Sequence, residues 1–185
     1  MRYRHIRPVV WREVADCESI LDAGAGTGRN IAYYPAGARV ACVDLSWQMV
    51  RRASARLDLT PAHANLILGN ALALPFRSAA FDAVVSTFLF CVLPDEEQPR
   101  ALREIARVLR PGGKAVLLEY QYSADGAQRA LMRMMAPWVE WAYGARFDRQ
   151  TSRHLMACGW RICEERFLSK DIVKLIVAEC PDRKN

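Results

Sequence analysis

The sequence predicts a single α/β domain in which a doubly wound parallel sheet carries helices on both faces. Two observations predict this fold class. Short apolar runs alternate along the chain with segments of helical periodicity, which is typical of parallel strands joined by crossover helices. The 185 residues, 52% of them apolar, are enough for one hydrophobic core. We therefore treat residues 1–185 as one domain.

Seven segments are predicted as strands because apolar, β-branched or aromatic residues in them are bounded by turn signals. The fourth, Phe-Asp-Ala-Val-Val-Ser-Thr, is typical of a buried strand, and the turn Pro111, Gly112 and Gly113 opens the fifth. The predicted bounds are 19–23, 39–43, 64–68, 81–87, 114–120, 160–168 and 172–179.

Four helices are predicted between these strands. Ser46 is a suitable N-cap for a helix over 46–57. In the segment 95–110 apolar residues such as Leu102 and Ile105 recur at helical spacing, and Pro111 ends the helix because proline cannot continue it. The remaining two helices are expected at 126–143 and 152–157.

The composition limits the cellular setting. No apolar run approaches the ~18 residues of a membrane span, and no apolar segment follows the basic residues 1–8 as it would in a signal peptide. We therefore expect a cytoplasmic protein. The six cysteines form no C-x-x-C pair, so neither a metal site nor a disulfide framework is expected.

The net charge of +6 allows an anionic partner. The excess arginines are scattered along the helices rather than gathered in one run. One interpretation is a solvated basic surface. The other is attraction to anionic lipid headgroups, which would bring the protein peripherally to the inner face of the membrane.

The strongest functional signal is the glycine-rich segment that follows the first predicted strand. It contains Gly24, Gly26 and Gly28, and glycine lets a ligand approach the backbone closely and permits a positive φ. A dinucleotide fingerprint would read G-x-G-x-x-G. Here the third glycine comes one position earlier, which disfavours a bound pyrophosphate.

Two polar residues follow the next two strands. Asp44 stands sixteen residues after Gly28, where a carboxylate can accept both hydroxyls of a ribose. Its alternative role is to flank the following helix together with Ser46. Asn70 could reach an adenine amino group, with backbone N–H groups beside it, or could be a turn residue only.

Taken together, these motifs resemble the class I S-adenosylmethionine-dependent methyltransferases, in particular their small-molecule, quinone and lipid methyltransferase branch. The resemblance is strong over residues 17–120. It rests on Ile-Leu-Asp-Ala-Gly-Ala-Gly-Thr-Gly at 20–28, Val-Asp-Leu-Ser at 43–46 with Met49, Gly-Asn-Ala at 69–71, the run 81–87, and Leu-Arg-Glu-Ile-Ala-Arg-Val-Leu-Arg-Pro-Gly-Gly at 102–113.

The resemblance implies a Rossmann-like, seven-stranded sheet, mostly parallel, with an antiparallel strand near the C-terminus. It also implies a cofactor-binding core over 17–120, an acceptor lid over 123–155 and C-terminal strands over 160–179. The implied cofactor is S-adenosylmethionine, with S-adenosylhomocysteine as product. The implied cofactor-binding residues are Asp22, Ala23, Gly24, Gly26, Thr27, Gly28, Asn30, Asp44, Leu45, Met49, Asn70, Ala71, Leu72, Ser86 and Thr87.

Two departures from the family pattern concern cofactor and acceptor. Relatives usually carry Asp where this chain has Asn70, although an amide oxygen still accepts a hydrogen bond from an adenine amino group. Only about twenty residues precede the first strand, whereas relatives often have a longer helical region that closes over the acceptor. We therefore expect a small lid or one from elsewhere in the chain.

The segment 123–155 is the lid candidate because it is rich in methionine, aromatic residues and arginine. One interpretation is a helix that packs its apolar face on the sheet. The other is an apolar acceptor pocket or a membrane-facing surface with a basic rim. Candidate catalytic residues are Cys91, which could also be an inert buried thiol, Glu119 and Tyr120.

The leading hypothesis is methyl transfer to a small apolar or amphiphilic acceptor: a lipid amine such as phosphatidylethanolamine, a quinone-like ring or a thiol. An RNA or protein methyltransferase is the alternative, and nucleic acid is disfavoured because the (Asn/Asp)-Pro-Pro-(Tyr/Phe) signature is absent at residues 86–89. A non-catalytic cofactor-binding protein or a nicotinamide oxidoreductase is the alternative of another class. The acceptor atom and the oligomeric state stay open.

Overall fold

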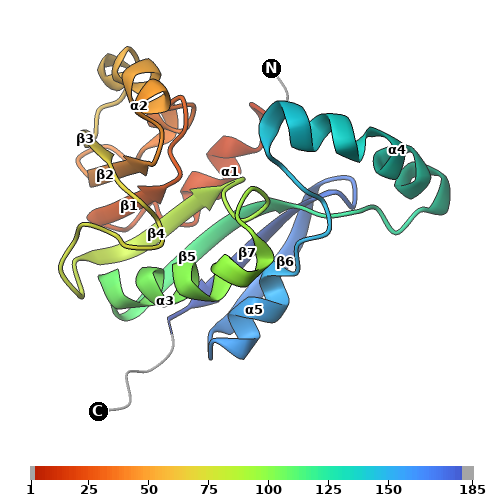
Figure 1. The fold of residues 1–185 in the computed structure, drawn as a ribbon. Coiled ribbons are helices and arrows are strands. Elements are labelled where there is room, and N and C mark those ends of the chain that lie inside the picture. Colours follow the sequence, from red (N-terminus) through yellow and green to blue (C-terminus); the bar gives the residue numbers. More distant parts are fainter. Residues whose placement is uncertain (1–2, 181–185) are drawn as a thin grey trace.

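The computed structural model describes residues 3–180, and its centre is one seven-stranded sheet (Figure 1). The strand order is β3-β2-β1-β4-β5-β7-β6. Strands β1 to β5 run parallel to one another, and β7 is antiparallel to both β5 and β6. The prediction of a mostly parallel sheet with an antiparallel strand near the C-terminus is therefore confirmed. The bounds are β1 Ser19–Ala23, β2 Arg39–Asp44, β3 His63–Leu68, β4 Phe81–Thr87, β5 Leu109–Tyr120, β6 Arg161–Ser169 and β7 Val173–Glu179.

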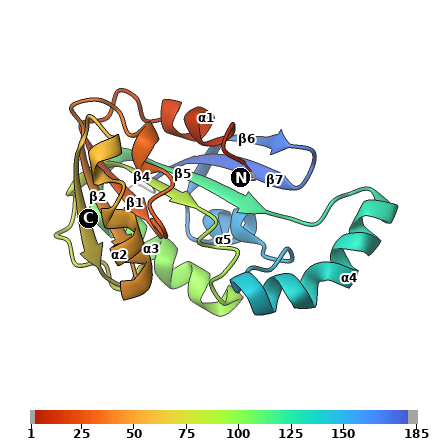
Figure 2. The same ribbon diagram turned by 90° about the horizontal axis from the view of Figure 1, so that it is seen from above.

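Helices cover both faces of this sheet. Helix α1 lies on one face, and α3 and α5 lie on the other (Figure 2). The bounds are α1 Arg7–Arg12, α2 Trp47–Ser54, α3 Gln98–Val108, α4 Gly126–Tyr143 and α5 Thr151–Ala157, with short 3-10 helices η1 Ile31–Tyr33, η2 Leu57–Leu59 and η3 Asp95–Glu97.

Two hydrophobic clusters hold these layers together, one on each face of the sheet. Val10 and Trp11 of α1 and Ala53 of α2 belong to the first cluster. Leu102 and Ile105 of α3 belong to the second. Burying a side chain of this size is worth roughly 1.5–3 kcal/mol relative to leaving it in water, so both helix layers are anchored by their apolar residues.

The boundary between α3 and β5 differs from the prediction. The helix expected over 95–110 ends at Val108, and the strand expected from 114 begins at Leu109. Leu109 is fully buried and pairs with Phe81, and a bulge follows before Lys114 pairs with Ala83. The helix-like spacing of the apolar residues therefore runs on past the point where the backbone has already become a strand.

Helix α4 has the predicted bounds, but it does not pack an apolar face on the sheet. The carboxylate of Asp125 caps it by accepting a hydrogen bond from Gln128 N at 2.8 Å, and Gly144, with φ 67°, ends it. Met132 is its single buried residue. Figures 1 and 2 show the helix standing away from the sheet, so the expectation that it packs on the sheet is wrong.

Within residues 3–180, no helix is both long enough and apolar enough to cross a lipid bilayer.

Candidate cofactor and acceptor site

The glycine loop after β1 combines a close packing contact with an open surface. Gly24, Gly26 and Gly28 have φ of 74°, 56° and 73°, the left-handed region that favours glycine. A Cβ on Gly28 would lie 2.7 Å from Ile31 and 2.9 Å from Ala53, so this glycine lets α2 approach the loop. A Cβ on Gly26 would meet no atom within 4 Å. The backbone at Gly26 is thus accessible to a ligand.

Other parts of the loop are held by neighbouring segments. Ala23 is buried at the end of β1, and a Cβ on Gly24 would lie 3.1 Å from the side chain of Leu89. The carbonyl oxygen of Thr27 accepts a hydrogen bond from Arg56 at 2.9 Å. The loop is therefore fixed on both sides of its exposed glycine.

Asp44, at the end of β2, faces this loop. Its Oδ2 accepts a hydrogen bond from Gly26 N at 2.8 Å, and its Oδ1 accepts one from Ser46 N at 2.9 Å. Ser46 in turn caps α2 by accepting a hydrogen bond from Met49 N. A carboxylate has about four acceptor positions, so Asp44 can flank the helix and still accept hydrogen bonds from a ligand.

The apolar residues next to Asp44 and the turn after β3 lie along one side of the loop. Leu45 is 69% exposed and Met49 is half-buried, so both side chains have surface that a ligand could cover. The side-chain oxygen of Asn70 accepts a hydrogen bond from Leu72 N at 2.9 Å, so the turn role is present. Ala71 is buried.

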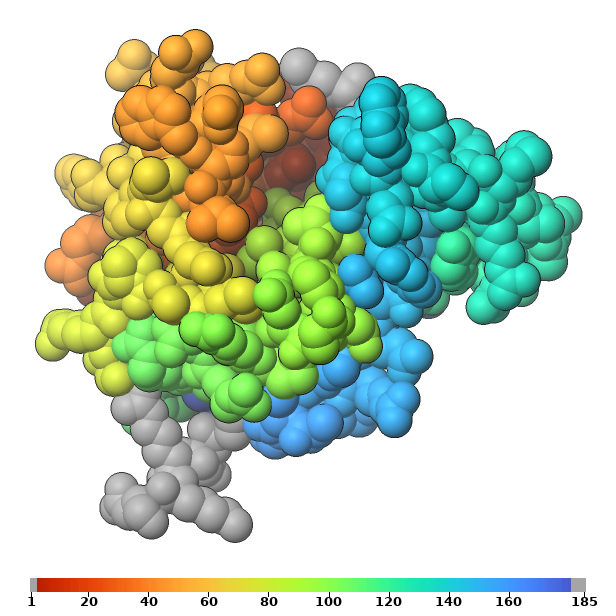
Figure 3. All heavy atoms as spheres, in the orientation of Figure 1, coloured from red at the N-terminus to blue at the C-terminus, as the bar shows by residue number. Residues whose placement is uncertain are grey.

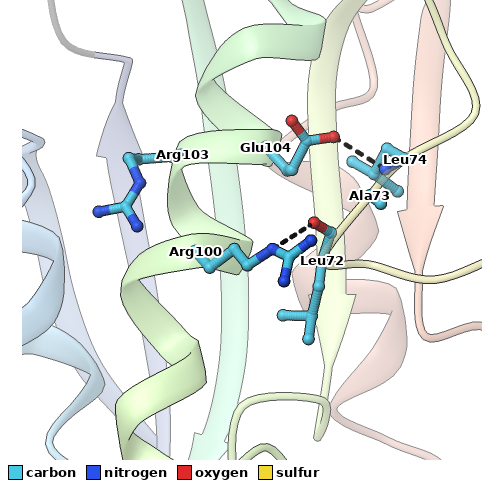
Figure 4. A pocket seen from close by; sticks show the side chains of 6 residues that line it. All are labelled: Leu72, Ala73, Leu74, Arg100, Arg103 and Glu104. Atoms are coloured by element: carbon cyan, nitrogen blue, oxygen red, sulfur yellow. Dashed lines mark hydrogen bonds between the residues drawn. The ribbon is translucent and has the colours of Figure 1, made fainter.

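Helix α3 holds this turn in place. Arg100 donates to the carbonyl oxygen of Leu72 at 3.1 Å, and Glu104 accepts from Leu74 N at 2.8 Å (Figure 4). Arg107 donates to the carbonyl oxygen of Leu74 at 2.9 Å. A cleft of about 340 Å³ lies between the turn and the helix, and it includes no residue of the glycine loop. We interpret these contacts as support for the turn.

A buried polar network lies beneath the glycine loop. Both carboxylate oxygens of Asp22 accept hydrogen bonds from Asn30 Nδ2 at 3.0 Å, and one accepts from Tyr34 at 2.6 Å. Burial raises the pKa of Asp22 to about 6, although these hydrogen bonds oppose the shift. Asp22 and Asn30 thus support the loop from inside the core.

The network continues to α1, through a residue that sequence analysis missed. Arg7 donates from Nη1 to Asn30 Oδ1, and the same nitrogen lies 3.4 Å from the hydroxyl of Thr87. A single arginine before Pro8 matches no spacing motif. The signal that could have found it is Pro8 itself, because proline is favoured in the first turn of a helix.

The end of β4 presents two hydroxyl groups to opposite faces of the sheet. Thr87 belongs to the network, since its hydroxyl lies 3.1 Å from Asn30 Nδ2. The hydroxyl of Ser86 is buried, and within residues 3–180 it has no hydrogen-bond partner. A buried polar group without a partner costs free energy, and it is compatible with a bound ligand or water.

Two of the three candidate catalytic residues concern the loop after β4: Cys91 belongs to it, and Glu119 binds its backbone. The carboxylate of Glu119 accepts hydrogen bonds from Phe90 N at 3.0 Å and Cys91 N at 2.8 Å. Burial raises the pKa of Glu119 to about 7 and that of Cys91 well above its usual value. Cys91 is therefore a protonated, buried thiol, and Glu119 holds the loop.

Tyr120, the third candidate, lies in an aromatic cluster at the end of β5. Its ring stacks on Phe88 with centroids 4.4 Å apart, and Tyr3 and Phe147 meet its edges at 5.9 and 5.6 Å. Phe147 belongs to the predicted lid segment, so this cluster joins the lid to the strand ends.

These groups gather at one edge of the sheet because parallel strands end together. Ala23 pairs with Val43 and with Ser86, and Thr87 pairs with Leu118, two residues before Tyr120. Figure 3 shows the surface hollowed between the segment of α2 and the segment of α4, with part of the N-terminal segment at its floor. In doubly wound sheets ligands bind at this edge.

The fold and the glycine loop define a nucleotide-cofactor domain of the methyltransferase type. The sequence pattern of the methyltransferase domain family matches residues 20–113, which is half of the chain. The chain therefore belongs to the S-adenosylmethionine-dependent methyltransferase family, and the resemblance seen in the sequence is confirmed.

Relatives and solved structures agree with this family. The chain is 35% identical over 128 residues to the demethylmenaquinone methyltransferase of Thermobifida fusca, covering 66% of this chain and 53% of that protein. It is 32% identical over 120 residues to the phosphatidylethanolamine N-methyltransferase of Cereibacter sphaeroides, and the match covers 63% of this chain and 58% of that protein. Geranyl diphosphate C-methyltransferase of Streptomyces coelicolor, solved with S-adenosyl-L-homocysteine, shares the fold at a TM-score of 0.74 and 14% identity. The superposition covers 95% of this chain and 76% of that chain.

The chain spans about half the length of the curated relatives compared with it, from 42% to 64%. The family pattern, over residues 20–113, includes the glycine loop, Asp44 and the run to Gly113.

Proposed function

We propose that this protein binds S-adenosylmethionine and transfers its methyl group to a small apolar or amphiphilic acceptor. The observation that carries the proposal is the glycine loop. Gly26 has a left-handed φ and open space over its Cα, and its N–H donates to the carboxylate of Asp44. An open backbone beside a carboxylate suits a ribose hydroxyl pair on a ligand lying along the strand ends.

The residues around the loop suit the remaining parts of the cofactor. Asp44 would accept the ribose hydroxyls, and Leu45 and Met49 would cover one side of the adenine. Asn70 and the backbone of Ala71 and Leu72 would meet the polar edge of the adenine. Hydrogen bonds from α3 hold this turn after β3 in place. Ser86 and Thr87 would lie beside the methionyl part. When bound, the cofactor supplies an electrophilic methyl group on sulfur.

Methyl transfer needs chiefly a nucleophile aligned behind the methyl carbon. The chain offers an apolar place for that alignment at Phe88, Tyr120 and Phe147, which form one aromatic cluster at the strand ends. The carboxylate of Glu119, in β5, accepts hydrogen bonds from Phe90 N and Cys91 N and so holds the loop after β4 in place. We therefore propose that the acceptor brings its own nucleophile, as an amine, a thiolate or an activated ring carbon does, and that Tyr120 contacts it.

The test is a screen with S-adenosylmethionine labelled in the methyl group. The purified protein is incubated with phosphatidylethanolamine, a demethylated quinone, an alkyl thiol or RNA, and label is counted in each extracted product. We expect label in one of the first three and none in RNA. The control is Asp44→Asn, which keeps the shape of the side chain and should lose transfer to the same acceptor.

Label in RNA alone would show that the acceptor is RNA and not a small apolar or amphiphilic molecule. Absence of label everywhere, together with no binding of S-adenosylhomocysteine in calorimetry, would overturn the function itself.

We further propose that α4 brings the protein to an anionic lipid surface. Five large apolar residues form an exposed stripe at helical spacing: Leu131, Met134, Met135, Trp138 and Trp141. Arg129 and Arg133 stand on the same helix, whereas Arg146 is already paired with Glu140 and Asp148. An apolar stripe flanked by arginines is typical of helices that lie in the membrane interface.

A further inference from the structure

We propose that Arg7 binds the carboxylate of the methionyl part of the cofactor and so selects ligands that carry an amino acid end. This inference rests on the proposed function, because it assigns one more group of the same site. It concerns α1, the helix that the sequence did not predict.

The position of Arg7 is fixed by the core. Trp11 of the same helix is 2% exposed, and its ring lies 4.4 Å from the ring of Tyr34. Val10 is fully buried beside it. Although α1 has only six residues, this packing fixes the place of Arg7, whose guanidinium group lies against Asn30 and Thr87.

The hydrogen bonds of Arg7 orient its guanidinium group. Asn30 uses its Nδ2 on the carboxylate of Asp22, which leaves its Oδ1 to accept from Arg7 Nη1. The hydroxyl of Thr87 lies 3.4 Å from the same nitrogen. Both direct partners are neutral groups. The other nitrogens of the guanidinium can therefore serve a planar anionic group in the fork geometry that arginine prefers.

The charge balance also favours an anion here. Burial lowers the pKa of Arg7, while Asp22, the carboxylate that attracts it electrostatically, already accepts hydrogen bonds from Asn30 and Tyr34. Arg29 is a second cation nearby. Within residues 3–180 no salt bridge pairs Arg7 with a carboxylate. A partly desolvated cation whose direct partners are neutral is stabilised when a ligand supplies the opposite charge.

The distance across the sheet suits the cofactor. Asp44 stands at the end of β2 and Thr87 at the end of β4, and β1 lies between them. Two strand spacings are about 10 Å. A ligand with its ribose at Asp44 and an aliphatic chain crossing the end of β1 would bring its terminal carboxylate to Arg7.

The test compares two ligands by calorimetry. S-adenosylhomocysteine carries the carboxylate, and 5′-methylthioadenosine has the same adenosine and thioether but no amino acid end. We expect Arg7→Gln to weaken S-adenosylhomocysteine at least tenfold and to change 5′-methylthioadenosine less than twofold. Arg7→Lys, which keeps the charge but loses the fork, should fall between. Arg12→Gln, an exposed arginine of the same helix, is the matched control and should change neither ligand.

Equal losses for both ligands would give Arg7 a purely structural role, and no loss for either would remove it from the site; each result overturns the inference while leaving the proposed cofactor intact. If the unchanged protein binds neither ligand, the cofactor proposal fails and this inference falls with it.

A measurement on the unchanged protein covers the case in which Arg7→Gln does not fold. Phenylglyoxal modifies accessible arginines, and the modified peptides are quantified by mass spectrometry. We expect S-adenosylhomocysteine to slow modification of Arg7 and 5′-methylthioadenosine to leave its rate unchanged. Equal rates with both ligands would overturn the assignment.

Discussion

At the scale of single residues, Asp44 shows how one side chain can have two roles. It accepts hydrogen bonds from Gly26 N and Ser46 N, so it joins the glycine loop to the start of α2. The sequence presented these as alternatives, a ribose ligand or a helix-flanking residue. The geometry allows both, because the two backbone donors use only part of the acceptor capacity of the carboxylate.

Asp44→Ala should weaken S-adenosylhomocysteine binding by ~1–3 kcal/mol, roughly 5- to 150-fold in Kd, because charge-assisted hydrogen bonds to the ribose are lost. Calorimetry measures the change. Asp58→Ala removes an exposed carboxylate from η2 and serves as control. Unchanged affinity in the Asp44 variant would contradict the ribose role.

Three glycines with positive φ permit a second prediction, which separates strain, packing and ligand contact. Gly37→Ala, Gly26→Ala and Gly28→Ala all place a Cβ at φ between 56° and 77°, and each should lose about 1–2 kcal/mol of unfolding free energy. Gly28→Ala should lose a further ~1–3 kcal/mol, since its Cβ would meet Ala53. Urea unfolding measures these losses.

Ligand binding distinguishes the other two glycines. Gly26→Ala should weaken S-adenosylhomocysteine, because its Cβ would occupy the space left open for the ligand, whereas Gly37→Ala should not. If these two variants bind equally well, the open surface at Gly26 is not the ligand site.

The site residues could be anticipated from the sequence only where a motif fixes the spacing. Gly24, Gly26, Gly28 and Asp44 follow strand ends at characteristic distances, and the structure brings them together. Arg7 could not be found this way, because it reaches the site through tertiary packing of α1. Nor could the sequence show that the carboxylate of Glu119 turns toward the backbone of Phe90 and Cys91.

At the scale of elements, the pattern of apolar residues in the sequence predicted the strands well but misplaced the junction between α3 and β5. β1 and β4 have the predicted bounds because β1 is buried throughout and β4 is buried everywhere except at the half-buried Asp82. The end of α3 was placed too late, since Leu109 fits a helical pattern and is nonetheless the first residue of β5. A bulge at this position absorbs the extra residues, and a bulge leaves little trace in hydrophobic spacing.

Helix α4 is the element with the clearest surface prediction. Trp141 is 85% exposed and Met134 is 74% exposed. The double variant Trp141→Ser and Met134→Ser should lose most co-sedimentation with liposomes containing anionic lipid at low salt, because the apolar stripe no longer inserts. Its melting temperature should stay within about 2 °C, since exposed substitutions usually change stability little.

Met156→Ser is the matched control, because this methionine is 62% exposed but lies on α5. Failure of the unchanged protein to sediment with anionic liposomes would count against the membrane proposal. Equal losses of co-sedimentation in the double variant and in Met156→Ser would show that α4 is not the membrane contact.

At the scale of the whole molecule, two buried carboxyl groups link stability to pH. Burial raises the pKa of Asp22 from 3.8 to about 6 and that of Glu119 from 4.5 to about 7. The folded protein therefore holds these protons more firmly than the unfolded chain does. Their contribution to stability is complete below pH 4 and is lost as the pH rises through about 6 and 7.

We expect the unfolding free energy to fall between about pH 4 and pH 7, by up to about 1.4 kcal/mol per pH unit for each group. Glu119→Gln should flatten the upper part of this decline, because the amide does not titrate. Urea unfolding at a series of pH values measures it. A variant with the same slope as the unchanged protein would show that Glu119 is ionised in the fold at neutral pH.

The antiparallel pair at the end of the sheet also constrains how the chain assembles. β7 is the last strand along the sequence, yet it lies between β5 and β6 rather than at the margin. Until residues 173–179 dock, one whole side of β5 has unpaired N–H and C=O groups, and such an open strand invites association with other chains. Assembly of this half of the sheet must therefore await a late, long-range event, and pulsed hydrogen exchange during refolding should show amides of β5 and β7 becoming protected together.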